Sequence, residues 1–501
     1  MKIGIDLGTT NCCVAYIDKE GNPQIVPNDE GDRTTPSVIF FDEDHVVVGM
    51  AAKEEAGINP ENTISYIKRQ MGDESFKFPR GDDYLTPEDL SAIILKKLKN
   101  MSEDYLGEEV DSVVITVPAY FNDAQRKATQ DAANIAGLKV LKIINEPTAA
   151  ALAYGVNNKS EDQNIMIYDL GGGTFDAVAM ELRGGNLRVL STNGNKQLGG
   201  FDFDNALLGY VIEKIEEKYD VDLYDDEYAI EYLREKVEDA KKALSSKSKT
   251  NIVINYENIR DKIEITQEIF NDLIRSDVRR TCDMMNFTLE DAGLTWDQVD
   301  KTIFVGGSSR IKLVRDMVEE LIGKKPSLEL NPDEVVAIGA AIQANLIESD
   351  GNANEHLSGI EIIDVNSHSL GIVVLNEEKE NVNCIIIKKD SPLPCSVTSS
   401  FFSTVENQEF IDIGVVEGEE EDLNYCSIVS EMTVRLPEVQ RPIGSEFLVT
   451  YSYDTDGIIH VDIFDSASQT FMQSIDIERK SNLSKQEIIE KKDKISNLEI
   501  E

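Results

Sequence analysis

The sequence has few of the residues that build metal or disulfide frameworks. Its 501 residues include six cysteines and four histidines. No cysteines have CxxC or other metal-ligand spacing, which argues against zinc modules and disulfide scaffolds and favours reduced thiols in a cytosolic protein. The adjacent Cys12 and Cys13 lie on an expected strand, so we expect one side chain to face the core and the other to face away. A small buried hydrophobe explains these cysteines better than a redox role does.

Basic residues are scarce as well, with 49 Lys and Arg against 93 Asp and Glu and a net charge of −44. Such a surface repels phosphate backbones and anionic lipid heads, so nucleic acid and membranes are poor candidate partners. No apolar run is long enough to span a bilayer, and no charged and then apolar leader precedes Ile3. We therefore expect a cytoplasmic location. The GxxxxGK[ST] pattern does not occur, which excludes a P-loop protein.

Two glycine-rich segments nearly repeat one another. Residues 3–10 read IGIDLGTT and residues 167–174 read IYDLGGGT. In each, an apolar strand ends in an aspartate, a glycine turn with threonine follows, and a second apolar strand comes next. Glycine lets backbone N–H groups approach an anion, and a carboxylate can hold a hydrated divalent cation. One such segment could be only a tight turn, but two matched copies predict a nucleoside triphosphate site with Mg²⁺ between facing hairpins.

The length of the chain predicts two or three domains, and residues 1–350 alternate strands and helices in an α/β pattern. We expect a strand at 113–117 and a helix from Asn122 or Asp123 to before Gly137. Two alanine-rich helices, each started by a proline, are expected at 146–155 and 331–341, and a charged helical segment is expected at 214–244. A glycine turn at 306–310 should open a further helix, with its apolar residues on one face: Ile311, Val314, Val318 and Leu321. The small residues of the two alanine-rich helices suggest close packing at a hinge, although ordinary core packing explains them equally well.

The pattern changes after a polar segment at 349–355, which marks an expected domain boundary. Six strands are expected beyond it, at 371–375, 383–387, 396–402, 410–416, 447–453 and 458–464. Asp456-Gly457 predicts a hairpin turn. Ser484 and Glu487 form a capping-box pattern that starts one helix near the end of the sequence. We therefore expect an all-β domain followed by a short helical tail.

Several of these segments resemble the DnaK-type seventy-kilodalton heat-shock chaperones. The resemblance extends from Lys2 to about Leu483, and its motifs lie at residues 3–11, 117–122, 145–155, 169–176 and 198–204. It implies a two-lobed actin-like or hexokinase-like α/β ATPase domain, an all-β peptide-binding sandwich and a short C-terminal helix. The implied boundaries are 1–350 for the ATPase domain, 351–364 for the linker, 365–480 for the sandwich and 481–501 for the tail.

The resemblance also implies which residues bind ATP or ADP with Mg²⁺, and K⁺ is a second candidate ion. The phosphate-binding residues are Gly8, Thr9, Thr10, Asn11, Gly171, Gly172 and Gly173, and Asp6 and Asp169 are the metal residues. Hydrolysis is assigned to Lys68, Glu146, Asp169, Thr174 and Asp176. The adenosine side comprises Glu238, Lys241, Lys242, Ser245, Gly307, Ser308, Arg310 and Asp333. Without the resemblance, Lys68 could be an ordinary solvated lysine. Glu146 could be a charge that stabilises the start of a helix, and Asp176 could simply end a strand.

A peptide groove and a relay between the domains follow from the same resemblance. The implied groove residues are Ile372, Leu375, Phe402, Val405 and Ile411. These aliphatic and aromatic side chains could equally be ordinary residues of the hydrophobic core. Pro118 and Arg126 match the family's relay between nucleotide and peptide domains. Unfolded, hydrophobic peptide segments are the implied ligands. A J-domain co-chaperone is implied near Lys142, Asn145 and Asp364, while a nucleotide exchange factor stays an open question.

The sequence departs from the general family pattern in four places. The segment between Gly72 and Thr86 is shorter than in the general chaperone, and in this it is similar to the HscC type. Residues 360–363 carry Glu361 in an otherwise apolar linker, where it should weaken docking or turn outward. The segment after Val374, which includes residues 376–380, is longer and more charged than in the family. The helical lid is missing apart from the last helix, so we expect fast peptide release and little effect of truncation after Ser481.

The resemblance implies an ATP-dependent chaperone whose nucleotide state controls binding of hydrophobic segments in unfolded proteins. Three alternatives stay open from the sequence. A sugar or small-molecule kinase would need a hydroxyl-binding base and would leave the β domain unused. An actin-like filament former would polymerise with ATP. A dedicated regulator within the chaperone family would bind one folded partner.

Overall fold

The structure is a computed structural model of the chain. It describes residues 1–42, 45–81, 83–158, 161–327, 329–347, 361–454, 459–476 and 483–501. The chain forms two compact units: the first unit is Met1–Ala119, Thr129–Glu361 and Ser484–Glu501, and the second unit is Tyr120–Ala128 and Ile362–Leu483. The expected boundary at 349–355 and the Asp456-Gly457 turn lie outside the described residues.

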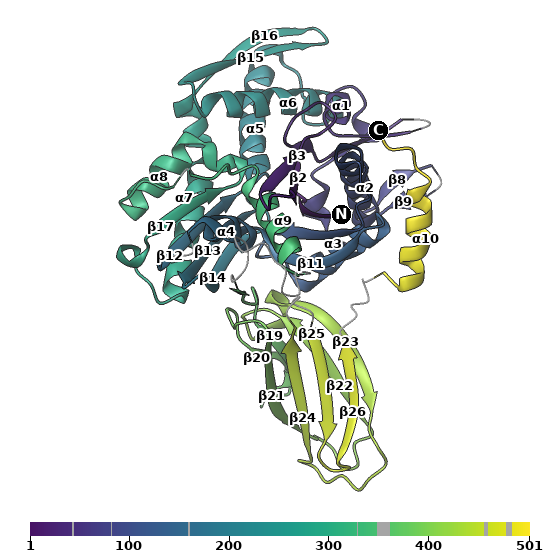
Figure 1. Cartoon of the computed structure of the whole chain (residues 1–501). Coiled ribbons are helices and arrows are strands. Elements are labelled where there is room, and N and C mark those ends of the chain that lie inside the picture. Colours follow the sequence, from purple (N-terminus) through teal and green to yellow (C-terminus); the bar gives the residue numbers. More distant parts are fainter. Residues whose placement is uncertain are drawn as a thin grey trace. The chain divides into compact units, whose positions relative to one another are not determined.

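Two mixed sheets form the centre of the first unit (Figure 1). The first has the order β11 (Lys139–Asn145), β10 (Ser112–Val117), β1 (Lys2–Asp6), β2 (Asn11–Ile17) and β3 (Pro23–Val26), with β4 (Thr35–Pro36) paired to β2. The second has the order β17 (Lys301–Val305), β12 (Gln163–Leu170), β13 (Phe175–Arg183) and β14 (Asn186–Asn195). Strands β1 and β2 pair antiparallel, as do β12 and β13. The two predicted glycine hairpins are thereby confirmed, one in each sheet.

Two alanine-rich helices pack closely, as their small residues predict. They are α4 (Glu146–Asn157) and α9 (Val335–Ile347). A Cβ atom on Gly339 of α9 would lie 1.8 Å from the carbonyl oxygen of Ala149 in α4, so only glycine fits there. Helix α4 continues two residues beyond its predicted end, because Gly155 lies inside the helix with room for Leu187 against it. Helix α9 begins at Val335, after a turn at residues 332–334.

The other helices of the first unit cover the sheets. They are α1 (Met50–Glu55), α2 (Pro87–Leu106), α3 (Asp123–Ile135, shared with the second unit), α5 (Gly200–Tyr219), α6 (Glu227–Leu244), α7 (Gln267–Asp291) and α8 (Lys312–Ile322). The charged segment expected at 214–244 is divided between α5 and α6, because Asp220, directly after α5, adopts the left-handed conformation with φ 53° and ends the helix. Helix α8 buries Val314, Val318 and Ile322, and the expected Leu321 is only half-buried.

The prediction that one of Cys12 and Cys13 faces away from the core is wrong, because both side chains are buried. Cys12 Sγ lies 3.2 Å from Ser37 Oγ on one side of β2. On the other side Cys13 packs against residues of α9. Both faces of β2 are covered, so the alternation of strand side chains does not bring either cysteine to solvent. Burial raises the pKa of the Cys12 thiol to about 11, which suits a packing role.

Short strands complete the outer part of the first unit. They are β5 (Val38–Phe41), β6 (Val46–Val48) and β7 (Thr63–Ser65) in one sheet, the pair β8 (Phe78–Arg80) and β9 (Asp83–Leu85), and the pair β15 (Lys249–Tyr256) and β16 (Ile259–Thr266). The shortened segment at 72–86 thus contains one small hairpin, in which Phe78 pairs with Leu85.

The second unit contains two four-stranded antiparallel sheets. One has the order β20 (Asn381–Ile387), β19 (Leu370–Leu375), β22 (Phe410–Glu417) and β23 (Ser427–Arg435), and the other has the order β21 (Cys395–Phe402), β24 (Glu446–Tyr453), β25 (Ile459–Asp465) and β26 (Thr470–Asp476). A single core joins the sheets, with Leu370 and Val415 from one and Tyr451 and Val461 from the other. Sequence reasoning missed β23 and β26, which are edge strands of mixed polarity.

The last helix, α10 (Lys485–Ser496), begins with the predicted capping box at Ser484 and Glu487. It belongs to the first unit, where Figure 1 shows it in yellow beside α2, β8 and β9. Ile495 is fully buried there. Beyond the helix, Val46 N–H of β6 donates to Glu499 O at 3.0 Å and Glu501 N–H donates to Val46 O at 2.9 Å. The segment expected as the remnant of a peptide lid therefore packs on the first unit.

Candidate functional site

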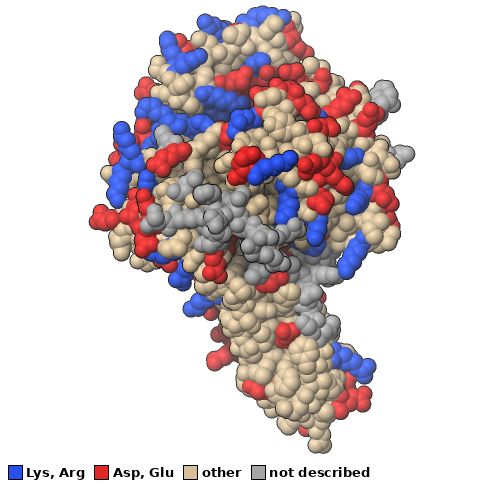
Figure 2. Space-filling model, in the orientation of Figure 1, with Lys and Arg blue, Asp and Glu red and all other residues tan. Residues whose placement is uncertain are grey.

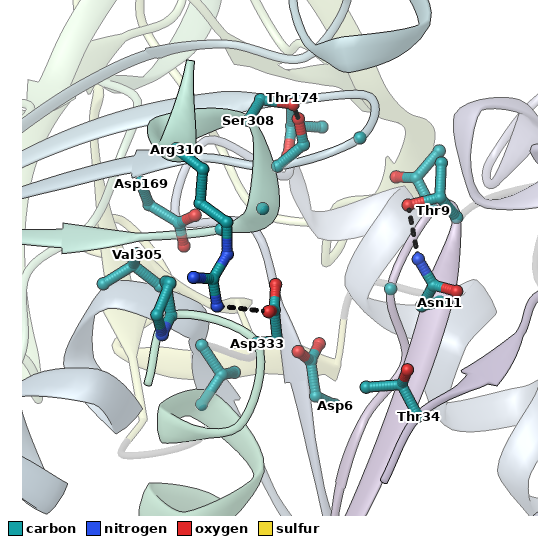
Figure 3. A pocket seen from close by; sticks show the side chains of 18 of the residues that line it. Asp6, Thr9, Asn11, Thr34, Asp169, Thr174, Val305, Ser308, Arg310 and Asp333 are labelled. Carbon is teal, nitrogen blue, oxygen red and sulfur yellow. Dashed lines mark hydrogen bonds and ion pairs between the residues drawn. The ribbon is translucent and has the colours of Figure 1, made fainter. Parts of the chain in front are cut away.

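The two glycine hairpins line one pocket of about 490 Å³ in the first unit (Figure 3). The predicted residues that line it are Asp6, Gly8, Thr9, Thr10, Asn11, Lys68, Glu146, Asp169, Gly171, Gly172, Thr174, Glu238, Lys241, Lys242, Ser245, Gly307, Ser308, Arg310 and Asp333. Gly173 and Asp176 are predicted site residues outside this lining. Residues from segments far apart in the chain thus converge on one cavity.

The two glycine turns contact each other directly. A Cβ atom on Gly172 would lie 2.4 Å from Thr10 Cγ2, and one on Gly173 would lie 2.6 Å from Thr9 Cγ2. Only glycine permits this approach, and it leaves the threonine hydroxyls and backbone amides of both turns beside the cavity. Such an arrangement of donors suits a chain of phosphates.

Two aspartates point into the pocket from the ends of β1 and β12 (Figure 3). Burial, followed by repulsion from Glu146, raises the pKa of Asp6 to about 7. The same causes raise the pKa of Asp169 well above its ordinary value. Asp169 Oδ2 is buried and has no hydrogen-bond partner among the described residues. Two carboxylates that line one pocket, one of them with an unpaired oxygen, fit a hydrated Mg²⁺.

Lys68 and Glu146 form a buried ion pair at the pocket wall. Lys68 lies on the short helix η2 (Ile67–Gln70), and Glu146 begins α4. Burial alone would lower the pKa of Lys68, but attraction by Glu146 and Asp6 outweighs it and raises this pKa. The lysine therefore carries a fixed positive charge beside the two aspartates.

Asp176 lies directly behind the pocket. It is opposite Asp169 in the β12–β13 pairing, and its carboxylate accepts a hydrogen bond from Ala119 N–H at 3.3 Å. It is almost completely buried. Asp176 therefore holds the segment after β10 through Ala119, and its negative charge contributes to the raised pKa of Asp169.

Charged side chains form the other side of the pocket. Lys53 lies 2.5 Å from Glu238, which also pairs with Lys242 at 2.8 Å. Burial alone would raise the pKa of Glu238, but these two lysines outweigh it and lower the pKa to about 2. Figure 3 shows Arg310 reaching Asp333, at 2.6 Å. These ion pairs fix the side chains on this side of the pocket, where the resemblance places the adenosine.

Sequence reasoning missed several residues here. The lining also includes Thr34, Met50, Val305, Gly306, Ile311, Pro332 and Val336, and Lys53 supports Glu238 from α1. Pro332 and Gly306 stood inside motifs that the sequence marks as a helix start and a glycine turn. Lys53 and Met50 carry no local signal, because only packing brings α1 to the pocket.

The sequence matches the model of a known protein family. A family model described as Hsp70 protein matches residues 2–80 and 76–499. The chain belongs to the Hsp70 family. Members of the Hsp70 family are ATP-dependent chaperones that bind ATP or ADP with Mg²⁺ and bind unfolded peptide segments. The match favours this family over the sugar kinases and actin-like filament formers. Within the described part of the chain, no helix could cross a bilayer.

In this Hsp70 protein the second unit carries a groove of about 880 Å³. Four of the five expected groove residues line it: Ile372, Leu375, Phe402 and Ile411. Ile372 is also part of the core, whereas Leu375 and Phe402 are exposed. Val405 is 54% exposed and is not among the lining residues. Figure 2 shows few charged side chains on the visible face of this unit.

The expected relay and partner residues lie on or directly after β10, α3 and β11. Pro118 is buried directly after β10, and Arg126 Nε of α3 donates to Phe121 O at 3.3 Å. Lys142 and Asn145 are in β11, with Asn145 buried. In the linker, Ile360 lies outside the described residues. Glu361 is exposed, and its carbonyl accepts a hydrogen bond from Leu187 N–H at 2.9 Å.

Proposed function

We propose that this Hsp70 protein is a DnaK-type chaperone, similar to the HscC type, in which ATP hydrolysis in the first unit controls peptide binding in the second. The observation that carries the proposal is the meeting of both glycine turns around Asp6, Asp169 and the Lys68–Glu146 pair. The short hairpin at 78–85 supports the HscC-like assignment.

The side chains around the pocket suit hydrolysis of a terminal phosphate. This reaction needs an in-line water and preorganised positive charge for the developing negative charge. Lys68, held by Glu146, offers an ammonium donor to the terminal phosphate. Glu146 and Asp176 are the proposed carboxylates that orient the water, and Thr174 is a hydroxyl donor. Mg²⁺ held by Asp6 and Asp169, through water, would neutralise charge on the phosphate oxygens.

The proposed assignment of domains follows the two units, with residues 1–350 binding nucleotide and residues 365–480 binding peptide. Pro118 and Arg126 are the proposed relay between them, and a J-domain protein is the proposed stimulating partner. Peptide release is proposed to be fast, since α10 packs on the first unit. A cytoplasmic location is part of the same proposal, in accord with the net charge of −44.

The test is the dissociation rate of a labelled apolar peptide in ATP and in ADP. We expect release to be about tenfold or more faster in ATP, which is a normal size for coupling between sites. Asp169→Asn and Thr174→Ala should remove most of this difference. Asp297→Asn changes an exposed carboxylate elsewhere in the first unit and should leave the difference unchanged. Equal rates in the two nucleotides for the unmodified protein would refute the coupling.

A further inference from the structure

Tyr66 has a backbone conformation that bulky side chains rarely adopt, with φ 60° and ψ 23°. It immediately precedes η2, and Lys68 follows two residues later. A residue in this region persists only where its surroundings hold it. The position of Lys68 in the pocket therefore depends on whatever holds Tyr66 and η2.

Phe201 is one of the side chains that contact this segment. Its ring centroid lies 4.4 Å from that of Tyr66. The guanidinium carbons of Arg69 and Arg234 lie 4.8 and 5.0 Å from the same centroid. Guanidinium groups are attracted to the electron-rich face of an aromatic ring, more strongly where water is excluded. One ring thus contacts residues from both η2 and α6.

Both arginines are held in place by other groups. Arg69 donates through both terminal nitrogens to Asp202 Oδ1 at 3.2 Å. Arg234 Nε donates to Glu231 at 3.0 Å, and its Nη1 donates to Asn205 at 2.7 Å. Because neither guanidinium is free to turn away, the contacts with Phe201 form a defined cluster of four side chains, Tyr66, Arg69, Phe201 and Arg234.

Phe201 is itself attached to the second glycine turn. Its backbone N–H donates to Gly172 O at 2.7 Å, and Gly200 N–H donates to Gly171 O at 3.0 Å. Gly171 and Gly172 line the pocket. The ring is therefore rigidly connected to one wall of the site while it contacts the segment that carries Lys68 on another.

We propose that Phe201 is a positioning residue that sets the distance between Lys68 and the second glycine turn. The proposal rests on the ATPase function proposed above and adds a residue that does not itself line the pocket. The four-residue cluster holds η2 against the start of α5, so that the Lys68 ammonium stays aligned with the phosphate-binding turn. Loss of the ring would let η2 shift, and a shift of about 1 Å at a catalytic group can cost about a hundredfold in rate.

The first test compares Phe201→Ala, Phe201→Leu and Phe201→Tyr in the full chain. We expect single-turnover ATP hydrolysis to fall about tenfold or more in Phe201→Ala, while the affinity for MgATP changes by less than about threefold. Phe201→Tyr retains an aromatic face and should stay within about twofold of the unmodified protein. Phe201→Leu should resemble Phe201→Ala, since it fills space without that face. Phe287→Ala, at an exposed aromatic of α7, is the matched control.

A second measurement does not depend on hydrolysis. Backbone hydrogen exchange at residues 67–71 should become faster in Phe201→Ala and stay unchanged in Phe201→Tyr and Phe287→Ala. If exchange there is the same in Phe201→Ala, or if the tyrosine fails to restore it, the positioning role is wrong. If the unmodified protein hydrolyses no ATP but exchange responds as expected, the ATPase proposal fails and the positioning of η2 stands.

Discussion

The ammonium of Lys491 lies 2.5 Å from the carboxylate of Asp89, which joins α10 to α2 across most of the chain length. Lys96 of α2 strengthens this contact, because its Nζ donates to the carbonyl oxygens of Ile495, Ser496 and Leu498 at 2.9–3.0 Å. The end of the chain thus contributes to the stability of the first unit.

We expect Ile495→Ala to weaken the docking of this tail by about 2–4 kcal/mol, because Ile495 is 0% exposed and its truncation leaves a cavity. Ile489→Ala on the same helix, at a 53% exposed position, should change it by less than about 0.5 kcal/mol. Limited proteolysis of residues 484–501 measures the difference. Equal cleavage of the two variants would contradict the docked position.

Deletion of residues 484–501 should leave the peptide off-rate within about twofold, because these residues pack on the first unit. The same deletion should lower the melting temperature of the first unit. Both are measured on one truncated protein, by peptide dissociation and by thermal unfolding. A large acceleration of peptide release would instead assign the tail a lid function.

The contact of Gly339 with Ala149 predicts a strong steric effect. Gly339→Ala would bring a methyl group to 1.8 Å from a backbone oxygen, so α4 and α9 would have to separate. We expect a loss of about 2–3 kcal/mol in the free energy of unfolding. Gly209→Ala in α5 is the control, since its Cβ would meet only Tyr224 Oη at 3.7 Å. Urea unfolding that is equally affected in both variants would exclude this steric cause.

The raised pKa of Asp6, about 7 in the folded protein without ligand, predicts a pH dependence. The unfolded chain has the ordinary aspartate value, so the folded state binds this proton more tightly. The stability from protonated Asp6 is full below about pH 4 and is lost as the pH rises through about 7. Asp6→Asn removes the buried charge, so it should stabilise the ligand-free protein by about 2 kcal/mol at pH 8 and much less at pH 5.

Urea unfolding at the two pH values measures this effect, with Asp297→Asn as the exposed control. Binding of MgADP gives a second readout, because protonation of Asp6 competes with a metal ion. The affinity of the unmodified protein should rise between pH 6 and 8, and the rise should be absent in Asp6→Asn. An equal gain of stability at pH 5 and pH 8 would argue against titration of Asp6.

Arg441 and Asp465 form a fully buried ion pair in the second unit, 2.5 Å apart and 1% and 0% exposed. Asp465→Asn should destabilise this unit by about 3–5 kcal/mol, because it leaves the guanidinium buried without its counter-charge. Burial alone would raise the pKa of Asp465, but hydrogen bonds from Ser468 and Arg441 outweigh it and lower the pKa. The pair therefore stabilises above about pH 4 and loses its effect as the pH falls.

Hydrogen exchange in β24 and β25 reports on this pair directly. The double variant Arg441→Met with Asp465→Asn should lose less stability than the two single variants added together, because neither charge then stays unpaired. Additive losses would mean that the two residues act independently. Protection of these amides, relative to the intrinsic exchange rate at each pH, should fall at acid pH in the unmodified protein, and this fall should be absent in Asp465→Asn.

Much of the fold could be predicted because it depends on local preferences. The glycine turns at 7–10 and 171–174, the start of α4 and the capping box at Ser484 each follow from a few neighbouring residues. Edge strands such as β23 and β26 could not be predicted from the sequence, since their polar and apolar residues do not alternate cleanly. The burial of Cys13 also depended on helix α9, which is more than three hundred residues away along the chain.

The sequence by itself determined the two glycine hairpins, the starts of α4 and α10 and the residues that could hold a triphosphate and Mg²⁺, because spacing and backbone freedom act within a few residues. Only the tertiary structure decided that Lys53 supports Glu238, that Phe201 contacts the segment bearing Lys68, and that α10 packs on α2. The physical reason is that such contacts join distant segments. Their formation depends on how whole elements pack against one another, which no short stretch of residues encodes.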